Sequence, residues 1–547
     1  MPVIVEQRAV RPTIIKTKKG DSMRKKHTIP FIFATTGHRD ICAKDVPKLE
    51  ATVKELFEMY LKKYPHTELI LLTALAEGAD MLVANVAKEL GLTLHIVLPY
   101  AENDYLSSFK EEGSSEEFLV LKEYASKVEV LCVDLEKDAS ECYRDLGEYL
   151  ADTSNILIAL WDGVTSGYKA GTSAIVNYTR LGFEMNRFDA LDGNSLIIIT
   201  TPRRSNPDVE TDFSVKYECL GKHVKGDEFA KMLGKIDSLN KETTIEKLED
   251  SSVAKTYMKH FGEKARKNQW RNKFYSIVIL LLTFVAVACL EIMHVLHIEP
   301  FIVGYGVGLL LAFGVYHFFM DKGKVQDNFV YSRGFAEALR IQNAWNHAGL
   351  GKSVARYYLY NQHYKFVWLK VVLKNLYYLD KAPFHLYATE YGVMSWIDEQ
   401  IEYFKQKSKE RHKRLEIVEF MERRFYRWGL ISLVLMFVIY VAEATHYIEH
   451  SEWWFNWHYL VLVSGLLLMA AAIMGERYSK IMGYEDEIYH FNVMLENFLD
   501  AKKMLKGVDK KSEKYQEIIY DLGIKALNEN RAWVVMHDKM RAEPSFE

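Results

Sequence analysis

Residues 29–40 read IPFIFATTGHRD, an apolar run that ends in a polar loop centred on glycine. The run predicts a buried strand over Ile29–Thr35. Similar apolar runs predict five more strands, at Glu68–Thr73, Thr93–Leu98, Lys127–Val133, Ile156–Trp161 and Ser195–Thr200. Helical patterns lie between them, for example at Val46–Lys63, Asp80–Leu90 and Glu141–Leu150. Buried strands that alternate with helices predict an α/β domain, a Rossmann-like doubly wound parallel sheet covered on both faces.

Ligands of such sheets bind beyond the carboxyl ends of the strands, and polar or glycine-rich segments occur at these points. After the first strand, Gly37 permits close backbone approach and Arg39 is suited to binding an anion. Two further segments open helices, whose free N–H groups favour a phosphate or hydroxyl. The predicted ligand-binding residues are Thr36, Gly37, His38, Arg39, Glu77, Gly78, Ala79, Asp80, Pro99, Tyr100, Trp161, Asp162, Gly163, Gly171, Thr172 and Ser173. Together they indicate a nucleotide-like ligand.

Several of these residues also fit a purely structural role. A single glycine after a strand is often only a turn residue. His38 fits a ligand contact and equally a residue that caps its loop or packs against the sheet. Trp161 and Asp162 have the chemistry to stack a base and to accept ribose hydroxyls, but Asp162 is equally compatible with a turn.

The second half of the chain contains four apolar segments, each near the roughly 20 residues that a membrane-spanning helix needs. They are Phe274–Leu296, Phe301–Met320, Trp428–Tyr447 and Trp457–Gly475. Short gaps join them into two hairpins. The alternative, four buried helices of a soluble bundle, is less favoured because no polar stripe interrupts these runs.

Charge predicts how these hairpins are oriented. Basic residues flank the inner ends of all four segments, whereas the hairpin tips lack Lys and Arg. The positive-inside rule therefore predicts a multi-pass protein of the inner (cytoplasmic) membrane with both termini cytoplasmic. The formal net charge of −3 gives no general attraction to nucleic acid. The five scattered cysteines suit a reducing cytosol.

The two hairpins look like copies of one another. Glu291-x-x-His294 recurs as Glu443-x-x-His446, and Gly308-Leu-Leu-Leu recurs as Gly465-Leu-Leu-Leu. Two Glu-x-x-His pairs would supply half of a di-iron site, but the partner segments offer no carboxylate. We therefore predict no metal site, and interpret these four residues as polar groups near the outer ends of their helices.

These patterns divide the chain into seven regions. They are a flexible arm (1–26), the α/β nucleotide-binding domain (27–205), a helical linker (206–272), the first transmembrane hairpin (273–320), a cytoplasmic helical region (321–427), the second hairpin (428–476) and C-terminal cytoplasmic helices (477–547).

The α/β motifs resemble the SLOG superfamily, which includes LOG-type nucleotide hydrolases, DprA-like proteins and the cytosolic domains of melastatin-type TRP channels. The resemblance rests on Thr36–Arg39, Ala74–Asp80, Ala159–Gly163 and Gly171-Thr172. The whole chain is similar to bacterial SLOG proteins fused to SLATT-type membrane segments, through Tyr331–Arg340, Ser353–Leu359 and Ala526–Trp533. The resemblance implies an effector of a bacterial conflict or anti-phage system. Its SLOG domain would bind a nucleotide second messenger or an NAD-derived ligand.

One departure from the family bears on catalysis. LOG hydrolases carry a catalytic glutamate after their Gly-Thr pair, and the corresponding residue here is Ile175. An apolar side chain cannot act as an acid or base, so we expect a sensor rather than an enzyme. Asp162, Glu77 and His38 keep a hydrolase open as the alternative, a membrane-anchored enzyme that processes nucleotides or NAD.

The favoured function is thus a nucleotide-sensing membrane effector. We expect a homo-oligomer in a lipid bilayer, gated or assembled by its ligand, with no required cofactor and no nucleic-acid partner. A transporter is the weakest interpretation, because the membrane segments offer few polar residues for a pathway.

Overall fold

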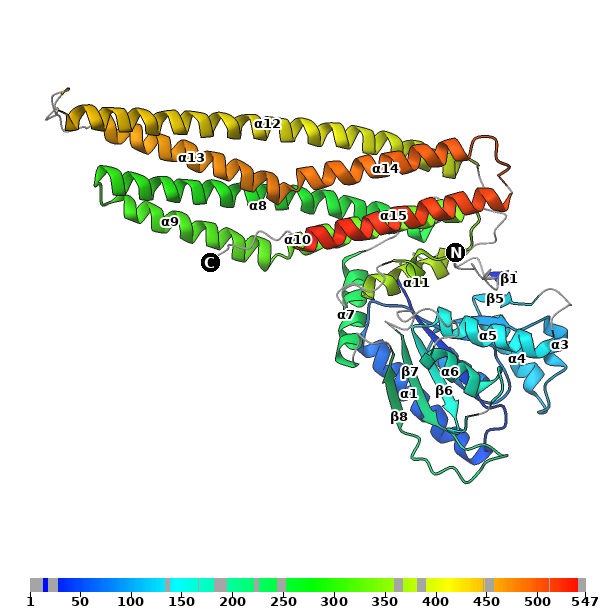
Figure 1. The fold of residues 1–547 in the computed structure, drawn as a ribbon. Helices are drawn as coiled ribbons and strands as arrows, with labels where there is room; N and C mark the ends of the chain where they lie inside the picture. The colour runs from blue at the N-terminus through cyan, green and yellow to red at the C-terminus, as the bar shows by residue number, and fades with distance from the viewer. Residues whose placement is uncertain are drawn as a thin grey trace. The chain divides into compact units, whose positions relative to one another are not determined.

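A computed structural model describes residues 13–17, 28–132, 138–165, 167–181, 194–220, 226–243, 252–358, 367–380, 390–445, 447, 457–510 and 512–539 (Figure 1). The chain divides into two compact units. The α/β unit comprises Met1–Thr256 and Ile341–Thr389, and the helical unit comprises Tyr257–Arg340 and Glu390–Glu547. The chain therefore passes between the two units three times.

The α/β unit is built on one sheet of eight strands in the order β1-β5-β4-β3-β2-β6-β7-β8. Its six central strands are parallel neighbours: β2 (Phe31–Gly37), β3 (Leu69–Thr73), β4 (Thr93–Leu98), β5 (Lys127–Val130), β6 (Ile156–Trp161) and β7 (Ser195–Thr200). This arrangement confirms the doubly wound parallel sheet.

Helices cover both faces of the sheet, as the continuous apolar strands require. On one face, Phe33 of β2 packs edge-on against Phe57 and Tyr60 of α1 (Val46–Lys63). On the other face, Ile32 and Ala34 share a core with α5 (Ala139–Thr153) and α6 (Thr172–Leu181). The α/β unit also contains α2 (Ala79–Glu89), α3 (Glu102–Leu106), α4 (Ser114–Tyr124) and the short 3-10 helix η1 (Ala43–Asp45).

Two edge strands lie outside the predicted set. β1 (Thr13–Thr17) pairs antiparallel with β5, so this part of the predicted flexible arm forms a strand. β8 (Val215–Cys219) pairs antiparallel with β7, and α7 (Gly226–Glu242) follows it, both within the predicted helical linker. Short edge strands that are partly polar give a weak sequence signal, because only one side of each is paired.

The largest departure from the predicted domain organisation concerns Ile341–Thr389, which the sequence placed in a separate cytoplasmic helical region. This segment completes the α/β unit. Its helix α11 (Val367–Asp380) packs on the sheet domain through Asn375, whose amide donates to the Pro30 carbonyl oxygen at 2.7 Å. Lys374 Nζ donates to the Ser154 carbonyl oxygen at 2.7 Å. The segment lies between the two apolar hairpins in sequence and belongs to the α/β unit in space.

The helical unit contains long helices that continue past the apolar segments. They are α8 (Val253–Leu296, from Tyr257 onward), α9 (Phe301–Gly314), the π-helix η2 (Val315–Asp321), α10 (Val325–His347, up to Arg340), α12 (Glu390–Ala444), α13 (Trp457–Met482), α14 (Tyr484–Met504) and α15 (Glu513–Lys539). α12 and α13 form one hairpin and lie side by side (Figure 1).

Four helices of the described chain are long and apolar enough to cross a membrane. In each, only 6% to 17% of the most apolar window is buried. Leu281, Leu310 and Phe437 are among the exposed side chains. A soluble bundle would bury such windows, so this exposure supports the interpretation as a membrane protein.

Close glycine contacts hold each hairpin together. A Cβ on Gly308 of α9 would lie 2.9 Å from the Cβ of Ala286 on α8. A Cβ on Gly465 of α13 would lie 3.2 Å from Leu433 of α12. The repeated Gly-Leu-Leu-Leu motif therefore has the same role in both hairpins, where glycine lets two helices approach closely.

Candidate functional site

The candidate site lies at the carboxyl ends of β2, β3, β4 and β6. The loop after β2 is packed against the start of α2. A Cβ on Gly37 would lie only 2.2 Å from the Ala79 Cβ, and a Cβ on Gly78 would lie 2.4 Å from the Arg39 carbonyl oxygen. Gly78 also has φ +79°, a conformation that favours glycine. The Ala79 N–H donates to the His38 carbonyl oxygen at 3.1 Å, so the two predicted loops are brought together.

Arg39 is held by aromatic and hydroxyl groups that the sequence did not single out. Its Nη2 donates to the Tyr143 hydroxyl at 2.9 Å, and its Nη1 lies 3.3 Å from Ser108 Oγ. The guanidinium carbon is 6.0 Å from the ring centroids of Tyr105, Phe109 and Tyr143. Five N–H donors in a planar group and a surrounding aromatic wall suit recognition of a phosphate or carboxylate.

Asp80 is the most unusual carboxyl group of this region. Its side chain is buried, and its Oδ1 has no hydrogen-bond partner in the part of the chain that the structure describes. Burial raises the pKa of Asp80 to about 7, although a hydrogen bond from the Ala76 N–H and the charge of Arg39 act in the opposite direction. Asp80 therefore gains or loses a proton near neutral pH.

Tyr105 has a second buried polar atom without a partner among the described residues, its phenolic oxygen. Burial, and then the nearby Asp80 carboxylate, raise the pKa of Tyr105 well above its usual value. Its hydroxyl therefore stays protonated and can donate. Two unsatisfied buried groups beside Arg39 are the groups that a polar ligand or an ordered water would satisfy.

Glu77 has a structural position. Its Oε1 accepts hydrogen bonds from the backbone N–H groups of Lys110 and Glu111, both at 2.7 Å. These contacts fix the loop after α3, which carries Ser108 toward Arg39. The Glu77 carboxylate therefore holds this loop in position beside Arg39.

His38 and Asp162 contact one another across the ends of β2 and β6. His38 Nε2 lies 3.0 Å from Asp162 Oδ1 and 3.3 Å from the Asp162 backbone nitrogen. Burial lowers the pKa of His38, so the imidazole is neutral at pH 7. Burial opposes ionisation of Asp162, yet hydrogen bonds from the Val164 N–H, His38 and Asn206 hold its pKa below the usual value. Asp162 is thus an ionised turn residue whose carboxylate accepts hydrogen bonds from several groups.

The Trp161 ring belongs to the hydrophobic core. Only 5% of the residue is exposed, its Nε1 donates to the Val164 carbonyl oxygen at 3.2 Å, and Arg180 lies 5.6 Å above the ring. The ring is therefore not presented for base stacking, the role that the sequence suggested for it. Ile175, at the family glutamate position, is buried in the same core.

The remaining predicted residues flank this centre. Gly163 and Gly171 have positive φ angles of 83° and 94°, and α6 begins at Thr172 with Thr172 and Ser173 buried. The Pro99 carbonyl oxygen accepts from the Cys132 N–H at 3.0 Å. Tyr100 lies on the same side as Arg39, because its hydroxyl is 3.3 Å from that of Tyr143. Thr36, at the end of β2, is buried.

The polar residues of the hairpins are separate from this site. Glu443 lies 3.6 Å from His458 of α13. Glu291 and His294 lie on α8, and His446 lies outside the described residues. Across the described ranges, no group of three or more His, Cys, Asp or Glu residues could hold a metal ion.

Two of the three segments 331–340, 353–359 and 526–533 meet inside the helical unit. Asn530 of α15 donates to the Gly334 carbonyl oxygen at 2.8 Å, and Arg333 lies 4.0 Å above the Trp533 ring. The third segment belongs to the α/β unit, where Ser353 caps a short 3-10 helix, η3 (Val354–Arg356). Leu359, at its end, lies outside the described residues.

The fold and this site define a membrane protein with a doubly wound α/β unit. Compared with known proteins, the chain matches no family model and no curated relative.

Proposed function

We propose that this protein is a ligand-gated membrane effector. A nucleotide second messenger or an NAD-derived molecule would bind at the carboxyl edge of the sheet and change the packing of the membrane hairpins. Oligomers of the chain would then disrupt the membrane. The assignment to a bacterial conflict system rests on the resemblance to SLOG and SLATT proteins.

One connection carries this proposal: the structural path from the sheet to the first membrane helix. Asp380, at the end of α11, accepts hydrogen bonds from the N–H groups of Val253 and Ala254, both at 2.7 Å, and from Ser252 Oγ at 2.9 Å. It thereby caps the first turn of α8, which continues into an apolar hairpin. Asn375 of the same helix is hydrogen-bonded to Pro30 and Asn155, which directly precede β2 and β6. A change in the sheet domain would therefore reach α8 through α11.

The chemistry of the edge supports an anionic, nucleotide-like ligand. The N-terminus of α6 offers backbone N–H groups, and Arg39 offers a guanidinium beside an aromatic wall. Gating needs the ligand to bind the active state better than the resting state. A ligand with equal affinity for both states does not shift the equilibrium between them.

A membrane-anchored hydrolase is the second candidate, and one observation favours it. Burial raises the pKa of Asp80 to about 7, and its Oδ1 has no partner among the described residues, which suits a general acid or base. Ile175 at the family glutamate position opposes LOG-type chemistry.

A ligand panel separates these two functions. The purified full chain would be tested by thermal shift with NAD, ADP-ribose, cyclic ADP-ribose isomers and cyclic di- and trinucleotides, and each mixture checked for breakdown by chromatography. Stabilisation by an intact ligand that also triggers ion flux from reconstituted vesicles supports the effector. Breakdown supports the hydrolase. A ligand that binds intact and leaves flux unchanged refutes gating.

The path through α11 has its own test. Asp380→Ala removes the cap of α8 without touching the ligand site, so we expect ligand to bind normally and flux to fall. Asp500→Ala, whose side chain is 69% exposed, is the matched control. Equal flux in the two variants would exclude this route.

We also propose the inner membrane as the location, with both chain ends in the cytoplasm. Single cysteines introduced near Glu299, at the tip of the first hairpin, should react with a membrane-impermeant thiol reagent added outside the cell. Cysteines introduced near Lys480 should react only after the membrane is permeabilised. The reverse pattern would invert the proposed orientation.

A further inference from the structure

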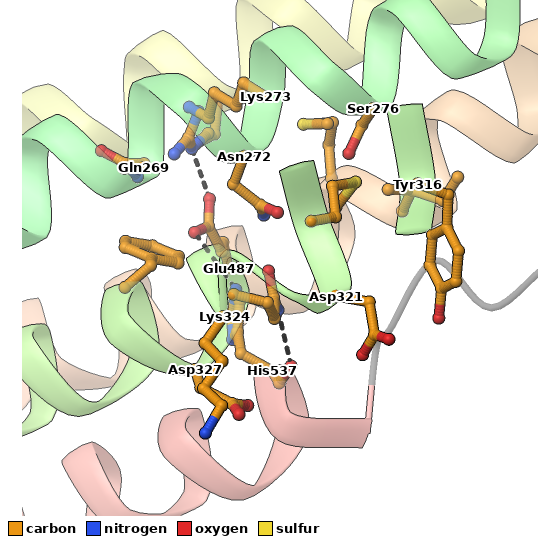
Figure 2. Close-up of a pocket in the computed structure, with 16 residues that line it drawn as sticks. Gln269, Asn272, Lys273, Ser276, Tyr316, Asp321, Lys324, Asp327, Glu487 and His537 are labelled. Atoms are coloured by element: carbon orange, nitrogen blue, oxygen red, sulfur yellow. Dashed lines mark hydrogen bonds and ion pairs between the residues drawn. The ribbon is translucent and has the colours of Figure 1, made fainter. Parts of the chain in front are cut away.

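The helical unit contains a cavity of about 70 Å³ that plays no part in the proposed function. It is lined by α8, η2, α10, α12, α13, α14 and α15 (Figure 2). The polar and charged lining residues on which the inference rests are Asn272, Lys273 and Ser276 of α8, Arg411 of α12, Glu487 of α14 and His537 of α15. The cavity is several times the volume that one water needs.

Positive charge exceeds negative charge around Glu487, one of the residues that line the cavity. Glu487 is only 2% exposed and forms an ion pair with Arg411, while Arg333 Nη1 lies 3.9 Å from its Oε1. His537 Nε2 is 3.8 Å from the same oxygen, but burial and the nearby Arg333 lower the pKa of His537 to about 3, so it is neutral. Two arginines thus surround one carboxylate, and Lys273 adds a third cation.

Neighbouring carboxyl groups do not remove this excess of positive charge around Glu487. Glu337 pairs with Arg340, and burial raises the pKa of Glu529 to about 7. Asp321 of η2 and Asp327 of α10 also line the cavity, together with Lys324, and the Asp321 side chain is 58% exposed. A buried cation without a counter-charge is costly, so the surroundings of Glu487 favour an anion.

Two polar atoms in the lining of the cavity have unused hydrogen-bonding capacity. Ser276 is 2% exposed, and neither its Oγ nor the Asn272 Oδ1 has a partner in the described chain. Figure 2 shows both side chains directed toward the centre of the cavity. The serine hydroxyl can donate a hydrogen bond to an anion. The asparagine side chain can do the same, because its amide can be rotated so that the NH₂ group points into the cavity.

We propose that this cavity binds a phosphate group. A tetrahedral oxyanion accepts hydrogen bonds from several directions, and here donors come from α8 and α12. Lysine and arginine provide charge-assisted contacts to phosphate, whereas a metal cation would face Lys273 and Arg411. Lys273 comes directly before the apolar segment of α8, so the phosphate is either that of a lipid headgroup or of a small soluble molecule.

The test uses the full chain, freed of phosphate and measured by thermal shift. One arm titrates inorganic phosphate against chloride at constant ionic strength in detergent. The other compares nanodiscs of phosphatidylglycerol with nanodiscs of phosphatidylcholine. We expect Lys273→Gln to need about tenfold more phosphate or anionic lipid for the same stabilisation, because a charge-assisted contact is lost. Ser276→Ala should weaken the response less.

Lys480→Gln is the control, because this lysine carries the same charge and its side chain is 68% exposed. A response to phosphatidylglycerol alone identifies a lipid headgroup, and a response to free phosphate alone identifies a soluble ligand. No response in the wild type, or equal responses in all three variants, overturns the proposal. Should Lys273→Gln fail to fold, Ser276→Ala, which removes a single oxygen, carries the test.

Discussion

Asn375 and Asn155, 220 residues apart in the chain, form a reciprocal pair of side-chain hydrogen bonds of 2.9 and 3.0 Å. Both residues are fully buried. Asn155 Oδ1 also accepts from the Ile32 N–H at 2.9 Å, and the Asn375 amide donates to the Pro30 carbonyl oxygen at 2.7 Å. The pair therefore joins the segment between the two hairpins to the first strand of the central sheet.

Replacing Asn375 by alanine should destabilise the protein by about 3 kcal/mol, because the Asn155 amide and the Pro30 carbonyl lose buried partners. Chemical unfolding of the full chain in detergent would measure the change. Asn85→Ala is the control, since Asn85 makes an exposed contact with Glu117, and its effect should stay within about 0.5 kcal/mol. A similar loss of unfolding free energy in both variants would mean that the buried Asn375–Asn155 pair does not contribute to stability.

Asp80 should make stability depend on pH. Its pKa in the folded protein, about 7, is above the usual 3.8, so folding favours the protonated form. Stability from this group is present below pH 4 and is lost as pH rises through 7, by up to about 4 kcal/mol. Asp80→Asn should therefore gain stability relative to wild type at pH 8 and show little difference below pH 4. Parallel pH profiles of the two proteins would contradict the raised pKa.

Arg39 should control affinity for an anionic ligand. Arg39→Lys keeps the charge but loses the planar guanidinium that contacts Tyr143 and Ser108. Once the ligand panel identifies a binder, we expect about tenfold weaker binding for Arg39→Lys and a larger loss for Arg39→Gln. Lys54→Gln, on the exposed side of α1, should bind as wild type does. Unchanged affinity in both Arg39 variants would show that the ligand does not bind at this edge of the sheet.

Gly308 and Gly306 provide a matched pair in the first hairpin. A Cβ at Gly308 would lie 2.9 Å from Ala286, whereas nothing lies within 4 Å of a Cβ at Gly306. Gly308→Val should cost about 1–3 kcal/mol through overpacking, seen as a lower midpoint of thermal unfolding in detergent. Gly306→Val should have a much smaller effect. A reversed order would show that α9 meets α8 through a different face.

The central strands and the long helices were predictable because their signal is local. The predicted ranges Thr93–Leu98, Ile156–Trp161 and Ser195–Thr200 coincide with β4, β6 and β7, and Val46–Lys63 coincides with α1. Each is a continuous apolar or amphipathic segment that needs no knowledge of its partners. The four apolar segments were evident for the same reason.

The site was predictable only in outline. Loops after parallel strands must meet at one edge, so Gly37, Arg39 and Asp80 could be assigned to it from sequence. The aromatic wall of Tyr105 and Tyr143 could not, because these residues come from helices whose packing is set by the whole sheet.

The sequence alone therefore determined the class of fold, the order of the parallel strands along the chain, and the presence of two apolar hairpins. Tertiary structure decided that Ile341–Thr389 completes the α/β unit, that Glu77 fixes a loop, and that the Trp161 ring is buried. It also decided that Arg411, Glu487 and Lys273 surround one cavity. The physical reason is separation along the chain. The periodicity of apolar residues shows which face of a single segment is buried. A hydrogen bond or ion pair between residues far apart in sequence forms only where the fold of the whole chain brings them together.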